Sequence, residues 1–366
     1  MTIFLVGGGS GGPTAPLLAV AYELLREKPK AELFFIGTKK GIEKRLISSS
    51  HLPINFLTIP AGKWRRYFSL MNFMDLFKIF AGFIKSWRLI KKHKPDIIFG
   101  AGSYAQVPVA YAAYLANVPV VIHQQDLEIL FSTRLVSAIA SAITVSFPGN
   151  TKNFSESTGL FREKHKSKIF YTGNPVRNNI LSGDAEKARS IFRLNSDFPT
   201  ILIMGGGTGA AELNRIVKEA LHGLLKYAQV IHITGGKTNG AIEHPHYHSY
   251  DFLGDELKHA YAVSDLVISR AGLSTISEIA RLGKAAVLVP LPASPQMNNA
   301  RYMALLQAAI CIPQKFLTPP ALIKLIRELL WDKKTTDMLK INVAKIMPKN
   351  SANEIMQIII KSARDK

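Results

Sequence analysis

The chain contains the same short pattern twice, an apolar run followed by a glycine-rich turn and then by a helical pattern. The first copy is FLVGGGSGG at Phe4–Gly12, and the second is ILIMGGGTGA at Ile201–Ala210. This pattern is typical of a parallel strand that passes into a helix, because glycine allows a tight turn and the helix then packs back on the sheet. The repeat predicts two α/β domains that are built alike.

Short apolar runs alternate with helical patterns on both sides of a polar middle segment. The expected strands are Thr2–Val6, Glu32–Ile36, Ile54–Ile59, Ile97–Phe99, Val118–His123 and Ala142–Val145, then Thr200–Met204, Gln229–Thr234, Leu266–Ile268 and Ala285–Val289. The expected helices include Pro16–Glu27, Met71–Lys92, Ala210–Leu225, Ser274–Leu282 and Asn298–Ala308. Such alternation favours parallel sheets covered on both faces. The predicted fold class is therefore α/β, with two Rossmann-like doubly wound domains facing across a cleft.

A length of 366 residues suits two domains of ordinary size. The polar segment Asn150–Lys168 is predicted to be a loop or linker. We expect an N-terminal domain at 1–172, a C-terminal domain at 173–350, and a C-terminal helix at 351–366 for which packing back on the N-terminal domain is one option.

The formal net charge of +20 suits nucleic acid, an anionic membrane or an anionic substrate as a partner. Nine Lys and Arg residues, against the single acid Asp75, lie between Lys63 and Lys94. The aromatic residues of this segment are Trp64, Tyr67, Phe68, Phe73, Phe77, Phe80, Phe83 and Trp87. Bases mixed with aromatics favour a membrane interface, although a stripe that faces the core stays open. We expect no nucleic-acid partner, because no reading motif is present.

Cysteine usage and hydropathy narrow the class further. The single cysteine, Cys311, excludes an internal disulfide framework and a cysteine-based metal cluster. We expect no secretory signal peptide and no spanning segment, because the longest apolar run, Val107–Ile122, reads as a helix followed by a strand.

The glycine loops suit a phosphate-bearing ligand, because the following helix offers free N–H groups and a partial positive charge. A tight turn between strand and helix is the alternative for either loop alone. Neither loop has the lysine of a P-loop, so hydrolysis of a nucleoside triphosphate is disfavoured. Open parallel sheets bind ligands at the carboxyl ends of their strands, where both loops are expected.

Four further motifs lie at strand ends. In SRAGLSTISE, Ser274 or Thr275 is expected to cap a helix, and Glu278 is either a carboxylate for ribose hydroxyls or an ordinary capping acid. The loop with Gln296, Asn298 and Asn299 suits sugar hydroxyls or a capped surface turn. Arg177 suits a diphosphate or is a surface arginine. His123 is expected to be structural, with Asp126 the carboxylate closest to it in sequence.

These motifs occur in an order that resembles the MurG family, the UDP-N-acetylglucosamine:N-acetylmuramoyl-(pentapeptide) pyrophosphoryl-undecaprenol N-acetylglucosaminyltransferases of glycosyltransferase family 28. The resemblance covers nearly the whole chain. The segments that carry it are GGSGGPTAPLLAVA, GAGSYAQVP (Gly100–Pro108), HQQD, GNPVR (Gly173–Arg177), GGGTGA, SRAGLSTISE and Gln296–Ala300.

The resemblance implies the GT-B fold and an inverting transfer of N-acetylglucosamine, from UDP-N-acetylglucosamine to lipid-linked muramoyl-pentapeptide. It implies no cofactor and no metal. It further implies a peripheral position on the cytoplasmic face of the cell membrane, and roles in peptidoglycan synthesis, cell shape and cell division.

The resemblance also implies roles for individual residues. Glu278 would bind the ribose, Leu253 the uracil and Gln296 the sugar. The other implied substrate-binding residues are Ser10, Gly11, Gly12, Asp126, Arg177, Gly207, Leu273, Ser274, Thr275, Ile276 and Ser277.

Three residues depart from the family pattern on the acceptor side. Pro13 replaces a loop histidine, and HQQD replaces H-E-Q-N, so Gln124 stands for a glutamate and Asp126 for an asparagine. We take Asp126 as the candidate proton acceptor. A related transferase with another lipid or glycan acceptor, and a nucleotide-sugar-binding homologue without turnover, remain the alternatives.

Overall fold

The computed structural model describes residues 1–9, 11–39, 41–62, 70–157, 168–205, 210–236 and 242–364, and these divide into two compact units. Unit 1 comprises Met1–Arg177 together with Pro348–Lys366, and unit 2 comprises Asn178–Met347. The first unit thus extends beyond residue 172 and takes in the end of the chain.

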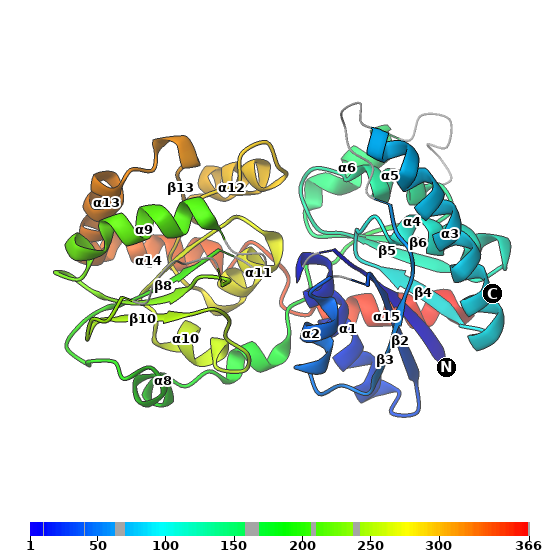
Figure 1. The fold of residues 1–366 in the computed structure, drawn as a ribbon, viewed down its shortest axis with the longest axis horizontal. Coiled ribbons are helices and arrows are strands. Elements are labelled where there is room, and N and C mark those ends of the chain that lie inside the picture. The colour runs from blue at the N-terminus through cyan, green and yellow to red at the C-terminus, as the bar shows by residue number, and fades with distance from the viewer. Residues whose placement is uncertain are drawn as a thin grey trace. The chain divides into compact units, whose positions relative to one another are not determined.

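Unit 1 is built on a sheet of seven parallel strands in the order β3-β2-β1-β4-β5-β6-β7 (Figure 1). The strands are β1 (Thr2–Val6), β2 (Glu32–Gly37), β3 (Ile54–Thr58), β4 (Ile97–Gly100), β5 (Val120–Gln124), β6 (Ala142–Val145) and β7 (Ile169–Tyr171). The helices are α1 (Gly11–Glu27), α2 (Glu43–Ser48), α3 (Leu70–His93), α4 (Gln106–Leu115), α5 (Phe131–Ser137), α6 (Pro148–Ser157) and α15 (Ser351–Arg364). The strand order reverses between β1 and β4.

Unit 2 repeats this architecture with six parallel strands in the order β10-β9-β8-β11-β12-β13. The strands are β8 (Thr200–Met204), β9 (Gln229–Ile233), β10 (Tyr247–Tyr250), β11 (Leu266–Ser269), β12 (Ala286–Leu288) and β13 (Ile310–Cys311). The helices are α8 (Ala185–Phe192), α9 (Ala211–Leu224), α10 (Leu257–Val263), α11 (Leu273–Leu282), α12 (Gln296–Leu305), α13 (Pro319–Trp331) and α14 (Lys333–Val343), with 3₁₀ turns at Asn178–Ser182 and Gln314–Phe316. The order reverses between β8 and β11, so the predicted class of two Rossmann-like domains is confirmed.

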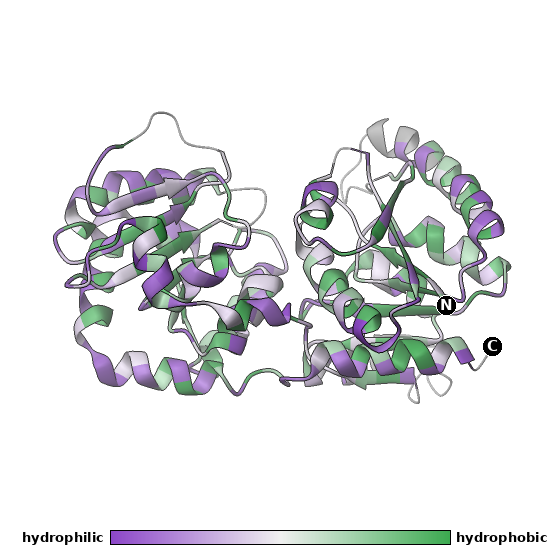
Figure 2. Cartoon of the chain, turned by 90° about the horizontal axis from the view of Figure 1, so that it is seen from below, coloured by the Kyte–Doolittle hydropathy of each residue, from purple (hydrophilic) through white to green (hydrophobic). Residues whose placement is uncertain are grey.

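The central strands are hydrophobic because helices cover both faces of each sheet. All residues of β4, β5, β6, β8 and β11 are buried, and hydrophobic residues gather on the strands in Figure 2. Continuous apolar runs are what strands buried on both faces require.

The last helix, α15, is part of unit 1 and packs on α1 (Figure 1). It presents one apolar face, on which Ile355, Met356, Ile359 and Ile360 are buried. The returning chain meets the end of β7 at Gly173, where a Cβ atom would lie 2.7 Å from Pro348 Cδ. Gly173 also has φ +72°, so both space and backbone conformation call for glycine.

Two features differ from the sequence predictions. The polar segment from Asn150 is not a loop throughout, because α6 continues to Ser157 and buries Phe154 at 1 % exposure. The short strands β7, β10 and β13 were not predicted. Among the described residues, no helix is both long and apolar enough to cross a membrane.

Candidate active site

The glycine loop after β1 lies beside the loop after β4, where the strand order of unit 1 reverses. Gly9 has φ +83°, and a Cβ atom there would lie 2.7 Å from Cε1 of Tyr104 and 2.9 Å from its hydroxyl. The aromatic ring of Tyr104 therefore packs directly on the loop backbone. A reversal of strand order is where open α/β sheets bind ligands.

A buried carboxylate supports the same loop. Glu43 is 0 % exposed, and its Oε1 accepts hydrogen bonds from the backbone N–H and the hydroxyl of Thr38, each at 2.6 Å. A Cβ atom on Gly8 would lie 3.1 Å from that oxygen. Burial raises the pKa of Tyr104, the hydrogen bond with Thr38 lowers it, and the nearby charge of Glu43 raises it. The net rise keeps the phenol protonated at neutral pH.

The loop after β5 is held by side-chain amides. Gln124, fully buried, donates from Nε2 to the carbonyl oxygens of Asp126 and Glu128, each at 2.8 Å. Asn150, on α6, donates to the same Asp126 carbonyl at 3.0 Å. The backbone at Asp126 is thus fixed by two amides, and its half-buried side chain lies at the carboxyl edge of the sheet.

His123 is structural, as predicted. It is fully buried, with Nδ1 2.9 Å from the Thr144 hydroxyl and Nε2 3.0 Å from the amide oxygen of Asn174. An amide oxygen only accepts, so Nε2 carries the proton and Thr144 donates to Nδ1. Burial lowers the pKa of His123 to about 4. A neutral, enclosed imidazole of this kind ties β5, β6 and the end of β7 together.

Several buried polar atoms at this edge have no hydrogen-bond partner among the described residues. They are Ser103 Oγ, Gln106 Nε2, Gln124 Oε1, Thr133 Oγ1 and Asn150 Oδ1. Gln124 is the last residue of β5, the other four belong to segments that follow β4, β5 or β6, and the five atoms include both donors and acceptors. Buried polar atoms are otherwise almost always paired, so this concentration marks a polar site in unit 1.

The helix that follows the first glycine loop begins at Gly11, so Gly11, Gly12 and Pro13 all lie in its first turn. Pro13 is buried and has no N–H group, so it removes one donor from the helix end. Its Cβ lies 3.5 Å from the position that a Cβ atom on Gly7 would take. Ser10 lies outside the described residues.

Unit 2 has the matching reversal of strand order between β8 and β11, and a buried cation lies there. Arg270 directly follows β11 and is 7 % exposed, and its guanidinium donates to the carbonyl oxygen of Val289 at 3.0 Å. Burial lowers the pKa of Arg270, while the charge of Glu212, in the first turn of α9, raises it. Gly207, in the second glycine loop, lies outside the described residues.

Helix α11 begins at this edge, and its N-cap is Gly272, without a side-chain cap. The prediction that Ser274 or Thr275 caps the helix is therefore wrong, because both lie inside its first turn. Glu278 lies in the second turn at 9 % exposure and accepts a hydrogen bond from the Tyr261 hydroxyl at 2.9 Å. A carboxylate in the second turn does not cap the helix, so the alternative that Glu278 is an ordinary capping acid is excluded.

The first turn of α12 lies beside the start of α11. Gln296 is the first residue of α12, two residues before the predicted helix start, and its Oε1 accepts from the backbone N–H of Leu291 at 3.0 Å. Its Nε2 lies 4.0 Å from the position of a Cβ atom on Gly272, and buried Asn299 donates to the carbonyl oxygen of Ala271 at 3.3 Å. The structure therefore brings Gln296 together with the segment Leu273–Glu278.

The remaining predicted residues lie at the margins of the two units. Leu253 is buried in the loop between β10 and α10, at the carboxyl end of β10. Arg177 ends the first segment of unit 1 and is half-buried, with no hydrogen-bond partner for its Nε among the described residues.

Both units match the same protein family. Residues 3–145 match the description Glycosyltransferase family 28 N-terminal domain, and residues 200–357 match Glycosyltransferase family 28 C-terminal domain. The chain belongs to glycosyltransferase family 28. Named relatives align with nearly all of the chain.

Two relatives carry the name UDP-N-acetylglucosamine--N-acetylmuramyl-(pentapeptide) pyrophosphoryl-undecaprenol N-acetylglucosamine transferase. The protein from Clostridium perfringens is 34 % identical over 99 % of this chain and 98 % of its own length. The protein from Treponema denticola is 34 % identical over 89 % of this chain and 88 % of its own length. The crystal structure of Acinetobacter baumannii MurG matches with a TM-score of 0.69 and 26 % identity, over 98 % of this chain and 99 % of that one.

Sequence reasoning did not single out three residues that the structure places at these sheet edges. Arg270 directly follows β11, so a charge at a strand end was the available signal for it. Glu43 begins α2 after the glycine-containing turn that follows β2, where its burial could not be read from the sequence. Tyr261 gave no signal, because its contact with Glu278 depends on how α10 packs in unit 2.

Proposed function

We propose that the chain transfers N-acetylglucosamine from UDP-N-acetylglucosamine to a lipid-linked muramyl-pentapeptide, the reaction stated in the names of its relatives. The observation that carries the proposal is the carboxyl edge of the unit 2 sheet. There the start of α11, the buried cation of Arg270 and the buried carboxylate of Glu278 follow the same strand. A helix start and a cation suit a diphosphate, and a fixed carboxylate suits ribose hydroxyls.

Each predicted donor residue takes a role in this scheme. Glu278 accepts hydrogen bonds from the ribose hydroxyls, Leu253 contacts the uracil, and Gln296 binds the sugar. Arg177 binds the diphosphate. The other residues proposed to bind substrate are Ser10, Gly11, Gly12, Asp126, Gly207, Leu273, Ser274, Thr275, Ile276 and Ser277.

The chemistry is a single displacement. An acceptor hydroxyl attacks C1 of the sugar, the bond from C1 to the diphosphate oxygen breaks, and UDP departs with the electron pair, so the anomeric configuration inverts. Cationic side chains and helix N–H groups stabilise the charge that develops on the diphosphate. The hydroxyl proton passes to a base, for which Asp126 is the proposed acceptor because it places a carboxylate at the edge of unit 1 that carries the unpartnered polar atoms.

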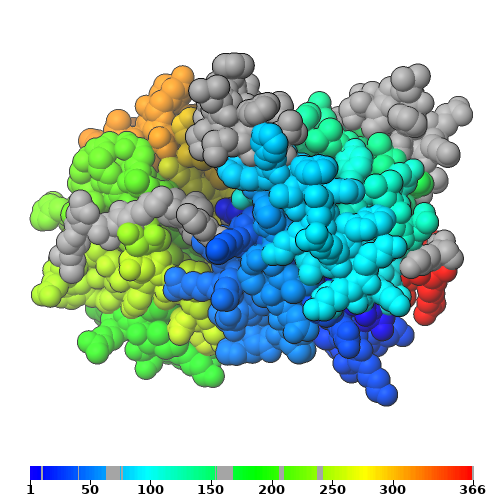
Figure 3. All heavy atoms as spheres, turned by 45° about the vertical axis from the view of Figure 1, so that its right-hand side comes forward, coloured from blue at the N-terminus to red at the C-terminus, as the bar shows by residue number. Residues whose placement is uncertain are grey.

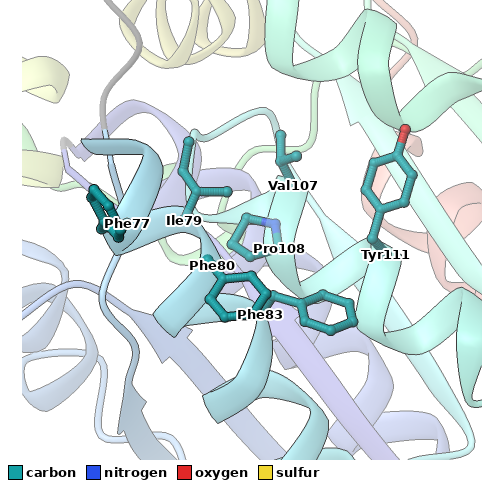
Figure 4. Close-up of a pocket in the computed structure, with 7 residues that line it drawn as sticks. All are labelled: Phe77, Ile79, Phe80, Phe83, Val107, Pro108 and Tyr111. Carbon is teal, nitrogen blue, oxygen red and sulfur yellow. The ribbon is translucent and has the colours of Figure 1, made fainter. Parts of the chain in front are cut away.

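We infer contact with a membrane surface from helix α3 and its neighbour α4 in unit 1. Phe77 and Phe80 are 63 % and 64 % exposed, unusual values for such large apolar side chains. They border a groove of about 570 Å³ whose lining comes from α3 and α4 (Figure 4): Phe77, Ile79, Phe80, Phe83, Val107, Pro108 and Tyr111. The one polar atom among these side chains, the Tyr111 hydroxyl, donates to the carbonyl oxygen of Leu135 at 3.0 Å.

Cations flank this apolar face of α3, and the described part of α3 lies at the surface of the molecule (Figure 3). Lys78, Lys85 and Arg88 are exposed on α3, whereas Asp75 is buried and paired with Lys78 at 2.8 Å. Exposed aromatics beside bases suit an anionic lipid surface. We place the protein at the cytoplasmic face of the membrane, as a peripheral protein. The predicted contacts at Trp64, Tyr67 and Phe68 lie outside the described residues.

Purified protein incubated with UDP-N-acetylglucosamine and a short-chain lipid-linked muramyl-pentapeptide should release UDP and form the disaccharide. Equal turnover with unrelated lipid or glycan acceptors would favour the broader transferase, which the changes at Pro13, Gln124 and Asp126 motivate. UDP binding without any product would favour the non-catalytic homologue.

Flotation with liposomes tests the membrane contact separately. The double variant Phe77→Ser and Phe80→Ser should lose binding to anionic vesicles. The matched control is Phe316→Ser in unit 2, because Phe316 is 61 % exposed and does not line the groove between α3 and α4. Equal flotation of all three proteins would remove the α3 surface from the proposal.

A further inference from the structure

Tyr261 stands out in unit 2 as a fully buried side chain with a polar end. It lies near the end of α10 and is the largest side chain that the described core encloses completely. Its hydroxyl is 2.9 Å from Glu278 Oε2 and 3.3 Å from Met204 Sδ, at the end of β8. The hydroxyl has one proton, and the closer and charged acceptor is the carboxylate, so Tyr261 donates to Glu278.

The backbone around Tyr261 is locked in place. Ser264 Oγ donates to the Tyr261 carbonyl oxygen at 2.9 Å. The ammonium group of Lys284, from the turn after α11, donates to the carbonyl oxygens of Ala262 and Ser264 at 3.0 and 2.8 Å. These bonds tie the end of α10 to the end of α11, so the phenol cannot drift relative to the helix that carries Glu278.

A carboxylate on a long side chain needs such a support to select ribose. Glu278 has three side-chain torsions, and two ribose hydroxyls are matched only when its oxygens have one orientation. A fixed donor on Oε2 sets that orientation before the nucleotide arrives, which lowers the ordering cost of binding. The Tyr261 hydroxyl is itself enclosed, so it acts through Glu278 and does not touch the ligand.

We propose that Tyr261 is a positioning residue, which holds the carboxylate of Glu278 in the orientation that recognises the two ribose hydroxyls of the uridine diphosphate. This inference rests on the proposed function, because it takes a uridine nucleotide as the ligand of unit 2. It adds a residue that the sequence motifs did not indicate, and it makes ribose recognition depend on the docking of α10 against α11.

The test compares Tyr261→Phe with Tyr247→Phe by calorimetric titration of the full chain with UDP and with 2′,3′-dideoxy-UDP. Tyr247 is the matched control, because it is also buried in unit 2 and its hydroxyl bonds to His232 at 2.9 Å. We expect Tyr261→Phe to weaken UDP binding about tenfold, equivalent to about 1.4 kcal/mol. The Kd of the dideoxy nucleotide should change less than about twofold in Tyr261→Phe. The control Tyr247→Phe should change the Kd of either nucleotide by less than about twofold.

Glu278→Gln completes a cycle with Tyr261→Phe. If the two residues act as one unit, the double variant binds UDP no more weakly than Glu278→Gln alone. Equal losses for UDP and the dideoxy nucleotide, or additive losses in the cycle, would overturn the positioning role. Should Tyr261→Phe fail to fold, Glu278→Asp serves instead, since it keeps the charge and withdraws the carboxylate from Tyr261; full ribose discrimination in that variant would also overturn the role.

Failure of the proposed function gives a different result. A wild-type chain that forms the disaccharide but binds both nucleotides equally overturns the inference and leaves the transferase function intact. A chain that forms no product, yet shows the tenfold effect confined to UDP, supports the inference and removes the acceptor assignment. Absence of UDP binding overturns both.

Discussion

His123 should make the stability of unit 1 depend on pH in a window set by its burial. Burial lowers the pKa of this histidine from its usual value of 6.5 to about 4 in the folded protein. Between these values the unfolded chain binds a proton that the folded chain does not, so the free energy of unfolding falls as pH falls from 6.5 towards 4. At about 1.4 kcal/mol per pKa unit, the full loss is about 3 kcal/mol, and about 2 kcal/mol of it occurs between pH 6.5 and 4.5.

The perturbation is His123→Gln, which removes the titrating group and keeps an amide that can bond to Thr144 or Asn174. Urea unfolding should be followed by tryptophan fluorescence in a Trp331→Phe background. Two tryptophans then remain, Trp64 and Trp87, and both belong to unit 1. Trp331 is 77 % exposed in unit 2, so its replacement costs little stability and leaves a signal specific to unit 1.

The measured quantity is the change in the free energy of unfolding between pH 6.5 and 4.5. We expect this change to be about 2 kcal/mol larger in the protein with His123 than in the His123→Gln variant. The comparison does not depend on how far the substitution itself lowers the free energy of unfolding at pH 7.5. His232 offers a replicate in unit 2, since burial also lowers its pKa to about 4. Parallel pH profiles for wild type and His123→Gln would refute the reasoning, because a histidine that can take up its proton in the folded state contributes no such slope.

Three further predictions concern the glycine loop and the candidate base. Gly9→Ala should destabilise the fold by about 1–3 kcal/mol, because it adds a clash with Tyr104 to a positive φ. Calorimetry should show an unchanged or slightly raised melting temperature for the control Gly149→Ala, because Gly149 lies in α6 and its added Cβ meets nothing within 4 Å. Pro13→His should raise kcat with the lipid-linked acceptor, since imidazole supplies a proton acceptor that proline lacks, and an unchanged kcat would point to another base. Asp126→Asn should lower kcat about a hundredfold or more if Asp126 is the base, and intact turnover in this variant would exclude it.

The strands of both sheets could be predicted because burial on both faces demands continuous apolar runs. Thr2–Val6, Ala142–Val145 and Thr200–Met204 have the bounds that the sequence predicts. By contrast, β10 reads YHSY, which lacks an apolar run and lies at the edge of its sheet. Edge strands such as this are specified by their neighbour's hydrogen bonds, which local sequence does not report.

Helix starts and tertiary contacts mark the limit of prediction within the site. The motif around Glu278 was recognised, but the helix is capped at Gly272 and not at Ser274 or Thr275, so Glu278 lies in its second turn. A side chain caps a helix only if the helix begins directly after it, and here α11 begins at Leu273, one residue before Ser274. The hydrogen bond from Tyr261 joins residues of two different helices, so no spacing rule predicts it.

The changes at Gln124 and Asp126 belong to one arrangement. In the family pattern H-E-Q-N the acid comes second and the amide last, whereas HQQD reverses them, so the segment keeps one carboxylate and moves it two residues along the chain. Residue 124 is fully buried and donates two hydrogen bonds to carbonyl oxygens, which an ionised glutamate cannot do because it has no hydrogen to donate. Residue 126 is only half-buried, and its backbone carbonyl oxygen accepts hydrogen bonds from the side-chain amides of Gln124 and Asn150. The amide at 124 thus builds the turn that carries Asp126, and the carboxylate moves from a fully buried position to one that is half-buried and reaches solvent.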